Sequence, residues 1–254
     1  MSPASANEAA QAVLVTGAGQ GLGAIIAAQL HSAGWKVAVS DLDGAAARAV
    51  ADTLDASGAT ACALALDVAR HAAFETALAS LQARWGGVQA LVNNAAVTVA
   101  TPVMDIAPDE FQRVLSINAG GVFAGSQVFG RHFAANGYGR IVNLASLAGQ
   151  NGGTATGAHY AASKGAIVTL TKVFARELGP SGVTVNAIAP GPLDLPIVYR
   201  TVPAERMDAF LGNIPVGALG DPSYVAATVA HLLSPAAGFV TGATWDINGG
   251  LYLR

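Results

Sequence analysis

Two side chains that could move a proton stand four residues apart in this chain, Tyr160 and Lys164. At this spacing on a helix, the phenol and the ammonium group lie on one face. A phenol titrates near pH ~10 in water, and a fixed positive charge nearby lowers that pKa towards neutral pH. Tyr160 could then take a proton from an alcohol or return one to a ketone. If the pair stood alone, two unrelated helix residues would explain the spacing equally well.

A hydroxyl group precedes this pair at a position that a substrate could reach. The segment Arg140–Ala145 is expected to form a strand, and Ser146 follows at its carboxyl end. There the serine can hydrogen-bond the oxygen atom whose proton Tyr160 exchanges. Gln150 and His159 lie nearby in the sequence and are expected to contact the same substrate, although a structural role in the core is the simpler explanation for a lone histidine.

A glycine-rich turn follows the first expected strand. It reads TGAGQGLG from Thr16 to Gly23 and leads directly into helical sequence. Such glycines permit a tight turn and close backbone approach, while the helix N-terminus offers free N–H groups and a positive dipole to a pyrophosphate. The glycine spacing is weak evidence by itself, and its place between a strand and a helix is what predicts a dinucleotide site. A turn without a ligand is the alternative.

An acidic residue, Asp41, ends the second expected strand, 18 residues beyond Gly23. A carboxylate near that distance reaches the adenosine ribose hydroxyls in such a unit. It would accept hydrogen bonds from a free 2′-OH and repel a 2′-phosphate, and no Arg or Lys adjoins it in the sequence. We therefore predict NAD rather than NADP as the cofactor. Asp43 is expected to cap the following helix instead.

The elements that must position these residues alternate along the chain. The expected strands are the short apolar runs Ala12–Thr16, Lys36–Asp41, Thr60–Ala65, Ala90–Asn93, Arg140–Ala145, Val183–Ile188 and Ala243–Ile247. The expected helices are Gly21–Ser32, Ala45–Ala56, His71–Arg84, Pro108–Ala134, Tyr160–Leu178 and Pro222–Leu233. Continuous apolar strands without polar alternation are typical of a sheet covered on both faces. We predict one doubly wound α/β domain over residues 1–254, with seven mostly parallel strands and its ligands beyond their carboxyl ends.

One stretch, residues 190–215, is too long for a tight connection and is rich in Pro and apolar residues. Long connections of this kind often cover a binding site, so we expect a substrate loop or lid. Its apolar side chains suit a neutral, partly apolar substrate, such as an aryl or cyclic alcohol. They are Leu193, Leu195, Ile197, Val198, Tyr199, Met207 and Phe210. A subunit contact or a buried core is the alternative role for the same residues.

Composition excludes several classes of protein. The net charge is −3 and no cluster of Lys and Arg occurs, so the sequence carries no footprint for nucleic acid. The long uncharged runs are broken by Asn, Gln, Pro and Gly, which argues against a membrane span. The single cysteine, Cys62, can form neither an internal disulfide nor a CxxC zinc site, and no metal is predicted. Residues 1–10 lack the features of a signal peptide and are expected to be a flexible tail on a cytoplasmic protein.

The scarcity of charge has a further implication. Only 11% of the 254 residues are charged and 52% are hydrophobic, whereas a typical soluble domain is about 25% charged. With membrane and nucleic acid set aside, the uncovered surface predicts contact between subunits of a homo-oligomer.

Taken in order, these motifs resemble the short-chain dehydrogenase/reductase (SDR) family over essentially the whole chain. The matching features are TGAGQGLG at 16–23, Asp41, Asp67-Val68, NNAA at 93–96, Asn118, Ser146, YAASK at 160–164, PG at 190–191 and WDINGG at 245–250. The resemblance implies a Rossmann-type fold and a homotetramer.

The resemblance also implies roles for individual residues. Tyr160 would be the general acid/base, Ser146 would position the substrate oxygen, and Lys164 would bind the nicotinamide ribose and lower the pKa of the tyrosine. Asn118 would hold a water that links Lys164 to solvent. The implied cofactor contacts are Gly17, Gln20, Gly21, Leu22, Gly23, Asp41, Asp67, Val68, the Asn94 backbone, Tyr160, Lys164, Pro190, Gly191 and Leu193.

The chain departs from the family pattern at three places. Ala96 replaces the glycine of NNAG, Leu195 replaces a threonine that often follows PG, and the glycine-rich loop 149–157 carries one extra residue. The sequence thus predicts an NAD-dependent oxidoreductase that interconverts a secondary alcohol and a ketone. An NAD(P)H-dependent ketone or 3-oxoacyl reductase is one alternative. A non-catalytic NAD(H)-binding regulator is another.

Overall fold

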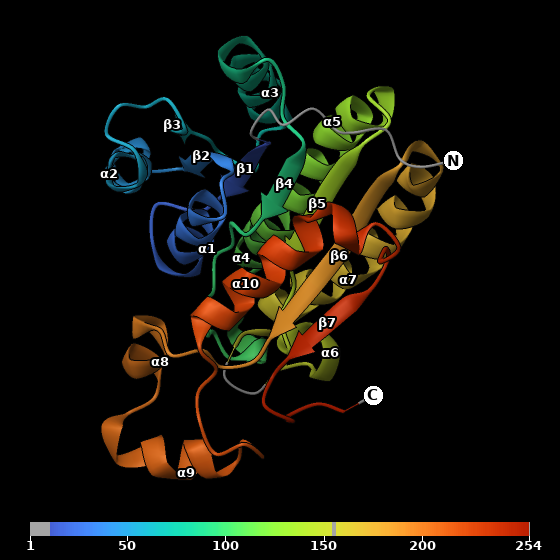
Figure 1. The fold of residues 1–254 in the computed structure, drawn as a ribbon. Coiled ribbons are helices and arrows are strands. Elements are labelled where there is room, and N and C mark those ends of the chain that lie inside the picture. The colour runs from blue at the N-terminus through green and yellow to red at the C-terminus, as the bar shows by residue number, and fades with distance from the viewer. Residues whose placement is uncertain (1–10, 154–155, 254) are drawn as a thin grey trace.

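Seven apolar segments pair into one sheet in the computed structural model, which describes residues 11–153 and 156–253 (Figure 1). The strands are β1 (Ala12–Thr16), β2 (Lys36–Asp41), β3 (Ala61–Ala65), β4 (Ala90–Asn93), β5 (Gly139–Leu144), β6 (Val183–Pro190) and β7 (Thr244–Ile247). Their order across the sheet is β3-β2-β1-β4-β5-β6-β7, and every pairing is parallel. The predicted α/β sheet is confirmed. The expected N-terminal tail lies outside the described residues.

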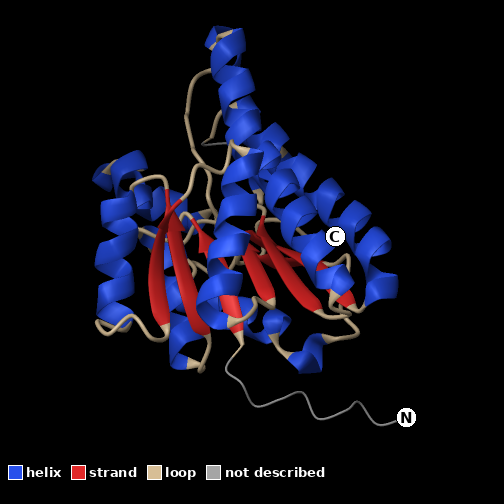
Figure 2. Ribbon diagram, turned by 90° about the horizontal axis from the view of Figure 1, so that it is seen from above, coloured by secondary structure: helices blue, strands red, loops and turns tan. Residues whose placement is uncertain are grey.

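Helices cover both faces of this sheet (Figure 2). They are α1 (Gly21–Ser32), α2 (Gly44–Leu54), α3 (His71–Trp85), α4 (Pro108–Leu115), α5 (Gly121–Ala135), α6 (Ala148–Asn151), α7 (Ala158–Leu178), α8 (Pro196–Thr201), α9 (Met207–Gly212) and α10 (Pro222–Leu233). Apolar residues of α1, α2 and α10 pack on one face, and those of α3, α5 and α7 pack on the other. Because both faces are covered, the strands have no polar face, which explains their continuous apolar sequence.

Side chains alternate between the two faces within each strand. In β1, Val13 and Val15 contribute to the core beneath α1 and α10, whereas Leu14 joins the core beneath α3 and α5. All three side chains are fully buried. The chain reverses its direction of progress across the sheet between β1 and β4, and a doubly wound sheet binds its ligand at the carboxyl ends of the strands beside such a reversal.

The helix expected over Pro108–Ala134 is in fact interrupted. A π-helix over Ser116–Gly120 separates α4 from α5. Single π-helical turns are uncommon and often occur at functional sites. The interruption carries Asn118 into the interior, where it is fully buried and bonds the main chain of Val97.

The segment over 190–215, expected to be a loop, contains two short helices, α8 and α9, and a 3-10 turn over Ala204–Arg206. It lies beyond the carboxyl ends of the strands (Figure 1). Pro196 is the first residue of α8, where its missing N–H costs no helical hydrogen bond. Among the described residues, no helix combines the length and the apolar character that a membrane crossing needs.

Candidate active site

The glycine-rich turn after β1 has no room for side chains. Gly17 adopts a φ of +61°, and a Cβ there would lie 2.6 Å from the Ala95 Cα. A Cβ on Gly23 would collide with the carbonyl oxygen of Gly17 and would lie 2.6 Å from Asn94 Nδ2. The turn therefore requires glycine at both positions, and it exposes backbone that a ligand can approach closely.

Helix α1 begins at this turn without neutralisation of its N-terminus. The side chain of Gln20 makes no capping hydrogen bond, and the first turn of the helix contains no acidic residue. Unpaired N–H groups and the positive end of the helix dipole together attract an anion. The turn is thus suited to a phosphate-bearing cofactor.

The carboxylate of Asp41 stands at the edge of the same turn. Its Oδ2 accepts a 3.0 Å hydrogen bond from the Gly19 N–H, and its Oδ1 accepts one of 3.1 Å from the Asp43 N–H. Asp43 caps α2 as predicted, because its carboxylate accepts hydrogen bonds from the first N–H groups of that helix. Asp41 is therefore oriented by the backbone and remains partly exposed beside the turn.

Other residues expected to contact a cofactor are already engaged within the protein. Asp67 accepts a hydrogen bond from the Ala69 N–H, and Val68 is 9% exposed and packs into the core. The Asn94 N–H bonds the Thr16 hydroxyl, and its side-chain amide bonds the carbonyl oxygen atoms at the start of the glycine-rich turn. Asn94 therefore joins the ends of β1 and β4, and its own N–H already has a partner.

The segment after β6 is held by main-chain hydrogen bonds. The Leu147 N–H donates to the carbonyl of Pro190, and the Gly191 N–H donates to that of Ile247. A Cβ on Gly191 would lie 2.9 Å from the Asn248 Cα, so this close approach also needs glycine. Leu193 is 7% exposed and packs in the core, which agrees with the alternative of a core role for this residue.

Tyr160 and Lys164 occupy the first turns of α7. Lys164 Nζ lies 5.5 Å from the centre of the Tyr160 ring and donates a 2.6 Å hydrogen bond to the carbonyl of Leu144, at the end of β5. Lys164 is 3% exposed, whereas Tyr160 is partly exposed. The predicted juxtaposition of ammonium and phenol is present, and the end of the sheet fixes the ammonium.

The proton affinities of this pair differ from the sequence expectation. Burial raises the pKa of Tyr160 above its ordinary value, and hydrogen bonds with the hydroxyls of Ser146 and Thr98 lower that pKa by less. Burial lowers the pKa of Lys164 to about 8. The net direction for the phenol is upward, because desolvation outweighs the two hydrogen bonds that favour the phenolate.

Thr98 is a site residue that sequence reasoning missed. It lies in the connection after β4, two residues beyond NNAA, and its hydroxyl acts on the phenol of Tyr160 together with that of Ser146. Ser146 Oγ also accepts a hydrogen bond from the Ala148 N–H, which orients it at the start of α6. The sequence signal that could have indicated Thr98 is its hydroxyl in the connection after β4, beside the point where the strand order reverses.

Asn118 has its side-chain amide fully engaged. Its Oδ1 accepts from the Val97 N–H, and its Nδ2 donates to the Val97 carbonyl and to Ser163 Oγ. It therefore connects the π-helix, the connection after β4 and α7. The water that the resemblance assigns to Asn118 would have to use the main chain of this segment, where the regular helical ladder is interrupted.

A buried polar layer supports the site from below. Asn93 Nδ2 donates to Ser126 Oγ and to Asn143 Oδ1, and Asn143 Nδ2 donates to Thr171 Oγ1. All four residues are 3% exposed or less. A satisfied buried network of this kind fixes the carboxyl ends of β4 and β5 against α5 and α7.

The structure does not support the two substrate contacts expected at Gln150 and His159. Gln150 Nε2 donates a 2.6 Å hydrogen bond to Asp246 Oδ1 on β7. His159 is fully buried, with Nε2 2.7 Å from Glu110 Oε1 and Nδ1 accepting from the Tyr160 N–H. Both ring nitrogens of His159 have protein partners, so the structural role is the one observed.

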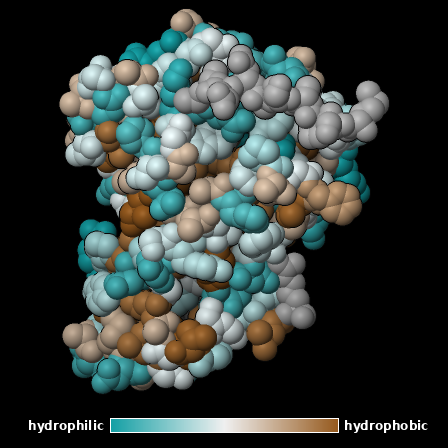
Figure 3. Space-filling model, in the orientation of Figure 1, coloured by the Kyte–Doolittle hydropathy of each residue, from teal (hydrophilic) through white to brown (hydrophobic). Residues whose placement is uncertain are grey.

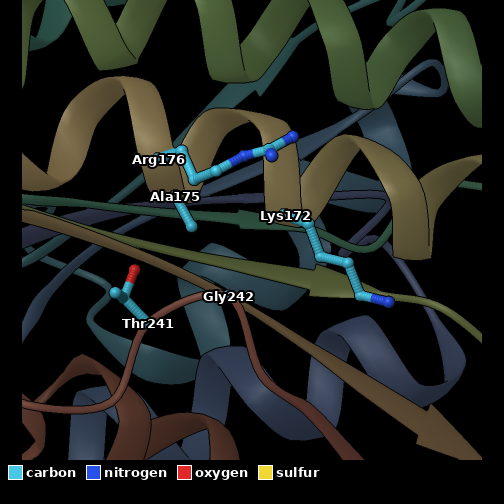
Figure 4. Close-up of a pocket in the computed structure, with 5 residues that line it drawn as sticks. All are labelled: Lys172, Ala175, Arg176, Thr241 and Gly242. Atoms are coloured by element: carbon cyan, nitrogen blue, oxygen red, sulfur yellow. The ribbon is translucent and has the colours of Figure 1, made fainter.

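A hollow between α7 and the connection before β7 offers no comparable chemistry. It is lined by Lys172, Ala175, Arg176, Thr241 and Gly242 (Figure 4). The charged ends of Lys172 and Arg176 point in different directions, so they do not converge on one ligand.

Comparison with known proteins agrees with this geometry. A family model described as "Enoyl-(Acyl carrier protein) reductase" matches residues 17–252. The 2-dehydro-3-deoxy-L-rhamnonate dehydrogenase (NAD(+)) of Sphingomonas sp. (strain SKA58) is 38% identical over 254 residues, which cover 98% of each chain. The short-chain reductase protein NovJ of Streptomyces niveus is 37% identical and covers 93% of this chain and 92% of its own. The 3-oxoacyl-[acyl-carrier-protein] reductase FabG of Vibrio cholerae is 36% identical and covers 94% and 96%.

Proposed function

Because the chain belongs to the short-chain dehydrogenase/reductase family of oxidoreductases, we propose that it interconverts a secondary alcohol and a ketone with NAD as the cofactor. The observation that carries the proposal is the arrangement of Ser146, Tyr160 and Lys164 at the carboxyl end of β5. Two hydroxyl groups act on the phenol there, and the ammonium is fixed behind its ring.

The described residues fit a nicotinamide dinucleotide. The turn around Gly17 and Gly23 leaves backbone free of side chains, and the uncapped N-terminus of α1 would hold the pyrophosphate. Asp41 would accept hydrogen bonds from the adenosine ribose, and its charge favours NAD over NADP. The name of the Sphingomonas relative specifies NAD(+), which is consistent with this choice.

Tyr160, Ser146 and Lys164 have different roles in the proposed proton transfer. When bound, the nicotinamide supplies or accepts the hydride. Tyr160 Oη takes the hydroxyl proton from the alcohol, or returns it to the ketone oxygen. Ser146 Oγ hydrogen-bonds the same oxygen and orients it towards the phenol. Lys164 presents its charge behind the phenol and stabilises the phenolate when it forms.

The substrate proposed is a neutral, partly apolar alcohol, such as an aryl or cyclic one. Hydrophobic residues gather on the surface of the α8–α9 segment, at the lower left in the view of Figure 1 (Figure 3). Ile197 and Tyr199 of α8 are half exposed, and the Tyr199 hydroxyl donates to Asp194 Oδ1. We include in the proposal that this segment serves as the substrate lid.

Assembly belongs to the same proposal. Phe123 of α5 and Val173 of α7 are each more than 40% exposed, and Phe123 packs against Phe174 with ring centroids 5.8 Å apart. Large apolar side chains grouped on two neighbouring helices favour burial against another subunit. This supports the homotetramer that the family resemblance implies.

A second candidate is a 3-oxoacyl reductase that works in the opposite direction. The observation in its favour is that the Vibrio cholerae relative is named as a 3-oxoacyl-[acyl-carrier-protein] reductase. A non-catalytic NAD(H)-binding regulator is disfavoured, because a binding module has no use for an oriented phenol and a buried lysine behind it.

The test is a steady-state assay that follows NADH absorbance. The purified protein is offered NAD⁺ or NADP⁺ with aromatic, alicyclic and polyol secondary alcohols, and NADH or NADPH with a 3-oxoacyl thioester. The proposal predicts oxidation of at least one apolar alcohol, with a preference for NAD⁺. Turnover of the thioester alone would favour the second candidate, and a preference for NADP⁺ would overturn the argument from Asp41.

A further inference from the structure

We propose that Glu110 and His159 are positioning residues for the catalytic tyrosine, because they join the first turn of α7 to α4 and to the connection that carries Thr98. The inference rests on the proposed function, since it assigns Tyr160 the proton transfer. Neither residue is part of the sequence motifs that led to the site, and neither has a side chain in contact with the phenol among the contacts described above.

The contacts form a chain that ends beside Tyr160. His159 Nε2 lies 2.7 Å from Glu110 Oε1, and the same carboxylate oxygen accepts a 2.7 Å hydrogen bond from Thr101 Oγ1. On its other side, His159 Nδ1 accepts a 2.9 Å hydrogen bond from the Tyr160 N–H. The Glu110 carboxylate on α4 therefore links the connection after β4 to the first turn of α7, next to the main chain of Tyr160.

This pattern of bonds assigns the tautomer of the histidine. Nδ1 accepts from a backbone N–H and so carries no proton, which leaves the ring proton on Nε2, facing Glu110. The Tyr160 N–H lies in the first turn of α7, where helical N–H groups lack partners within the helix. Gly157, the N-cap residue, has no side chain to supply one. His159 therefore caps the Tyr160 N–H and, through its bond to Glu110, fixes the catalytic residue relative to α4.

The connection after β4 is held at both ends by the same helical region. Asn118 of the π-helix bonds the main chain of Val97, and Glu110 of α4 bonds Thr101. Between these two anchors lies Thr98, whose hydroxyl acts on the phenol. A third link joins the Gly157 N–H to the Val99 carbonyl. Loss of the Glu110 anchor would free one end of this connection and the start of α7 together.

The electrostatic surroundings of the pair are simple. Glu110 faces His159, Thr101 and, at longer range, the positive charge of Arg113 on its own helix. His159 is fully buried, and the Glu110 side chain is 26% exposed. Hydrogen bonds from Thr101 and His159 hold the pKa of Glu110 below its usual value, so the carboxylate is ionised and accepts both bonds at neutral pH.

Three variants separate positioning from mere folding. Glu110→Ala removes both bonds, whereas Glu110→Gln keeps an oxygen that can accept them. His159→Asn keeps an acceptor near the Tyr160 N–H and loses the reach to Glu110. The matched control is Glu75→Ala, since Glu75 is a glutamate whose ion pair with His71, at 3.6 Å on α3, is exposed.

Each variant is assayed for kcat per cofactor-binding site, with sites counted by fluorescence titration with NADH. We expect Glu110→Ala and His159→Asn to lower kcat about tenfold, while the KM for NAD⁺ changes less than about twofold. Glu110→Gln should recover most of the lost rate. The limb of the pH–rate profile that reports the phenol should move to higher pH in the two impaired variants, because the hydroxyls that lower its pKa are displaced.

A second measurement does not depend on turnover. The ultraviolet difference spectrum of the phenolate is titrated in each variant with and without Tyr160→Phe, which isolates the Tyr160 phenol from the other tyrosines. The inference predicts a higher phenol pKa in Glu110→Ala and an unchanged one in Glu75→Ala. It is overturned if Glu110→Ala matches Glu75→Ala in phenol pKa, or in both kcat per site and pH profile. A wild-type protein without oxidoreductase activity would refute the proposed function, and the phenol titration would still decide the positioning role.

Discussion

Replacement of Lys164 by methionine should show how much the buried ammonium lowers the stability of the fold, separately from what it contributes to activity. The ammonium is 3% exposed, and its hydrogen bond in the protein goes to the carbonyl of Leu144. Burial lowers its pKa from 10.5 to about 8. Methionine has a similar length without the charge, so Lys164→Met removes the desolvation cost and leaves the volume nearly unchanged.

The magnitude follows from that pKa. At about 1.4 kcal/mol per pKa unit, a lowering from 10.5 to about 8 means that the charged lysine destabilises the folded protein by roughly 3 kcal/mol at neutral pH. The variant leaves the Leu144 carbonyl without its partner, which costs about 1–3 kcal/mol. At neutral pH the two effects nearly cancel, and Lys164→Met should be as stable as the wild type or up to about 2 kcal/mol more stable, although it loses the activity.

The dependence on pH is the sharper part of this prediction. Because the folded-state pKa lies below the unfolded-state pKa, the unfolded chain binds more protons between about pH 8 and 10.5, and wild-type stability gains with pH there. The variant lacks this gain. The difference in unfolding free energy, variant minus wild type, should therefore fall by up to about 3 kcal/mol as the pH rises from about 7 to about 10.5.

The assay is denaturant unfolding of both proteins over that pH range, with Lys172→Met as the control. Lys172 lies on the same helix, but its side chain is exposed, so its substitution should leave the pH dependence of stability unchanged. Taking differences removes the titration of all other groups. A difference between Lys164→Met and wild type that stays flat across the range would refute the reasoning about the buried ammonium.

The remaining predictions concern the cofactor turn and the phenol. Asp41→Ala should weaken NAD⁺ binding about 10- to 100-fold in a fluorescence titration, because one charge-assisted hydrogen bond is worth about 1.5–3 kcal/mol. Asp43→Ala should leave binding unchanged and lower the unfolding free energy by about 1 kcal/mol, since only the cap of α2 is lost; equal binding by both variants would contradict the assignment. Gly23→Ala should weaken binding more than tenfold through its collision inside the turn, whereas Gly179→Ala, where an added Cβ meets no atom within 4 Å, should bind normally. Thr98→Val should move the phenol limb of the pH–rate profile upwards, and an unmoved profile would exclude its hydroxyl from the site.

The sheet could be predicted well from the sequence because its strands are buried on both faces. The bounds of β1, β2 and β4 agree with the prediction, since their apolar runs end abruptly at polar residues. Local sequence could not predict the π-helix over Ser116–Gly120 or the short helices α8 and α9. Asn118 of the π-helix bonds the main chain of Val97, which lies 21 residues earlier in the chain, so the contact is not local in the sequence. Helices of six residues, such as α8 and α9, are too short to be stable without tertiary contacts.

The candidate site likewise contains residues that the sequence could predict and residues that it could not. The sequence placed Tyr160 and Lys164 together because their spacing lies within one helix, where geometry is fixed locally. It could not place Thr98 or Glu110, because their contacts depend on how separate connections meet at the end of the sheet. The sequence left His159 between a substrate contact and a structural role, because adjacency to Tyr160 in the sequence does not determine which way the ring points on the helix. The structure shows the structural role.

Hydride transfer measured in a Tyr160→Phe variant tests the central claim most directly. The phenyl ring preserves the packing and removes the group that moves the proton. With an alcohol that the wild type oxidises, the account predicts that NADH formation falls about 10²- to 10⁴-fold, while the dissociation constant of NAD⁺ stays within about threefold. A variant that binds NAD⁺ normally and oxidises the alcohol at the wild-type rate would contradict the assignment of Tyr160 as the general acid/base.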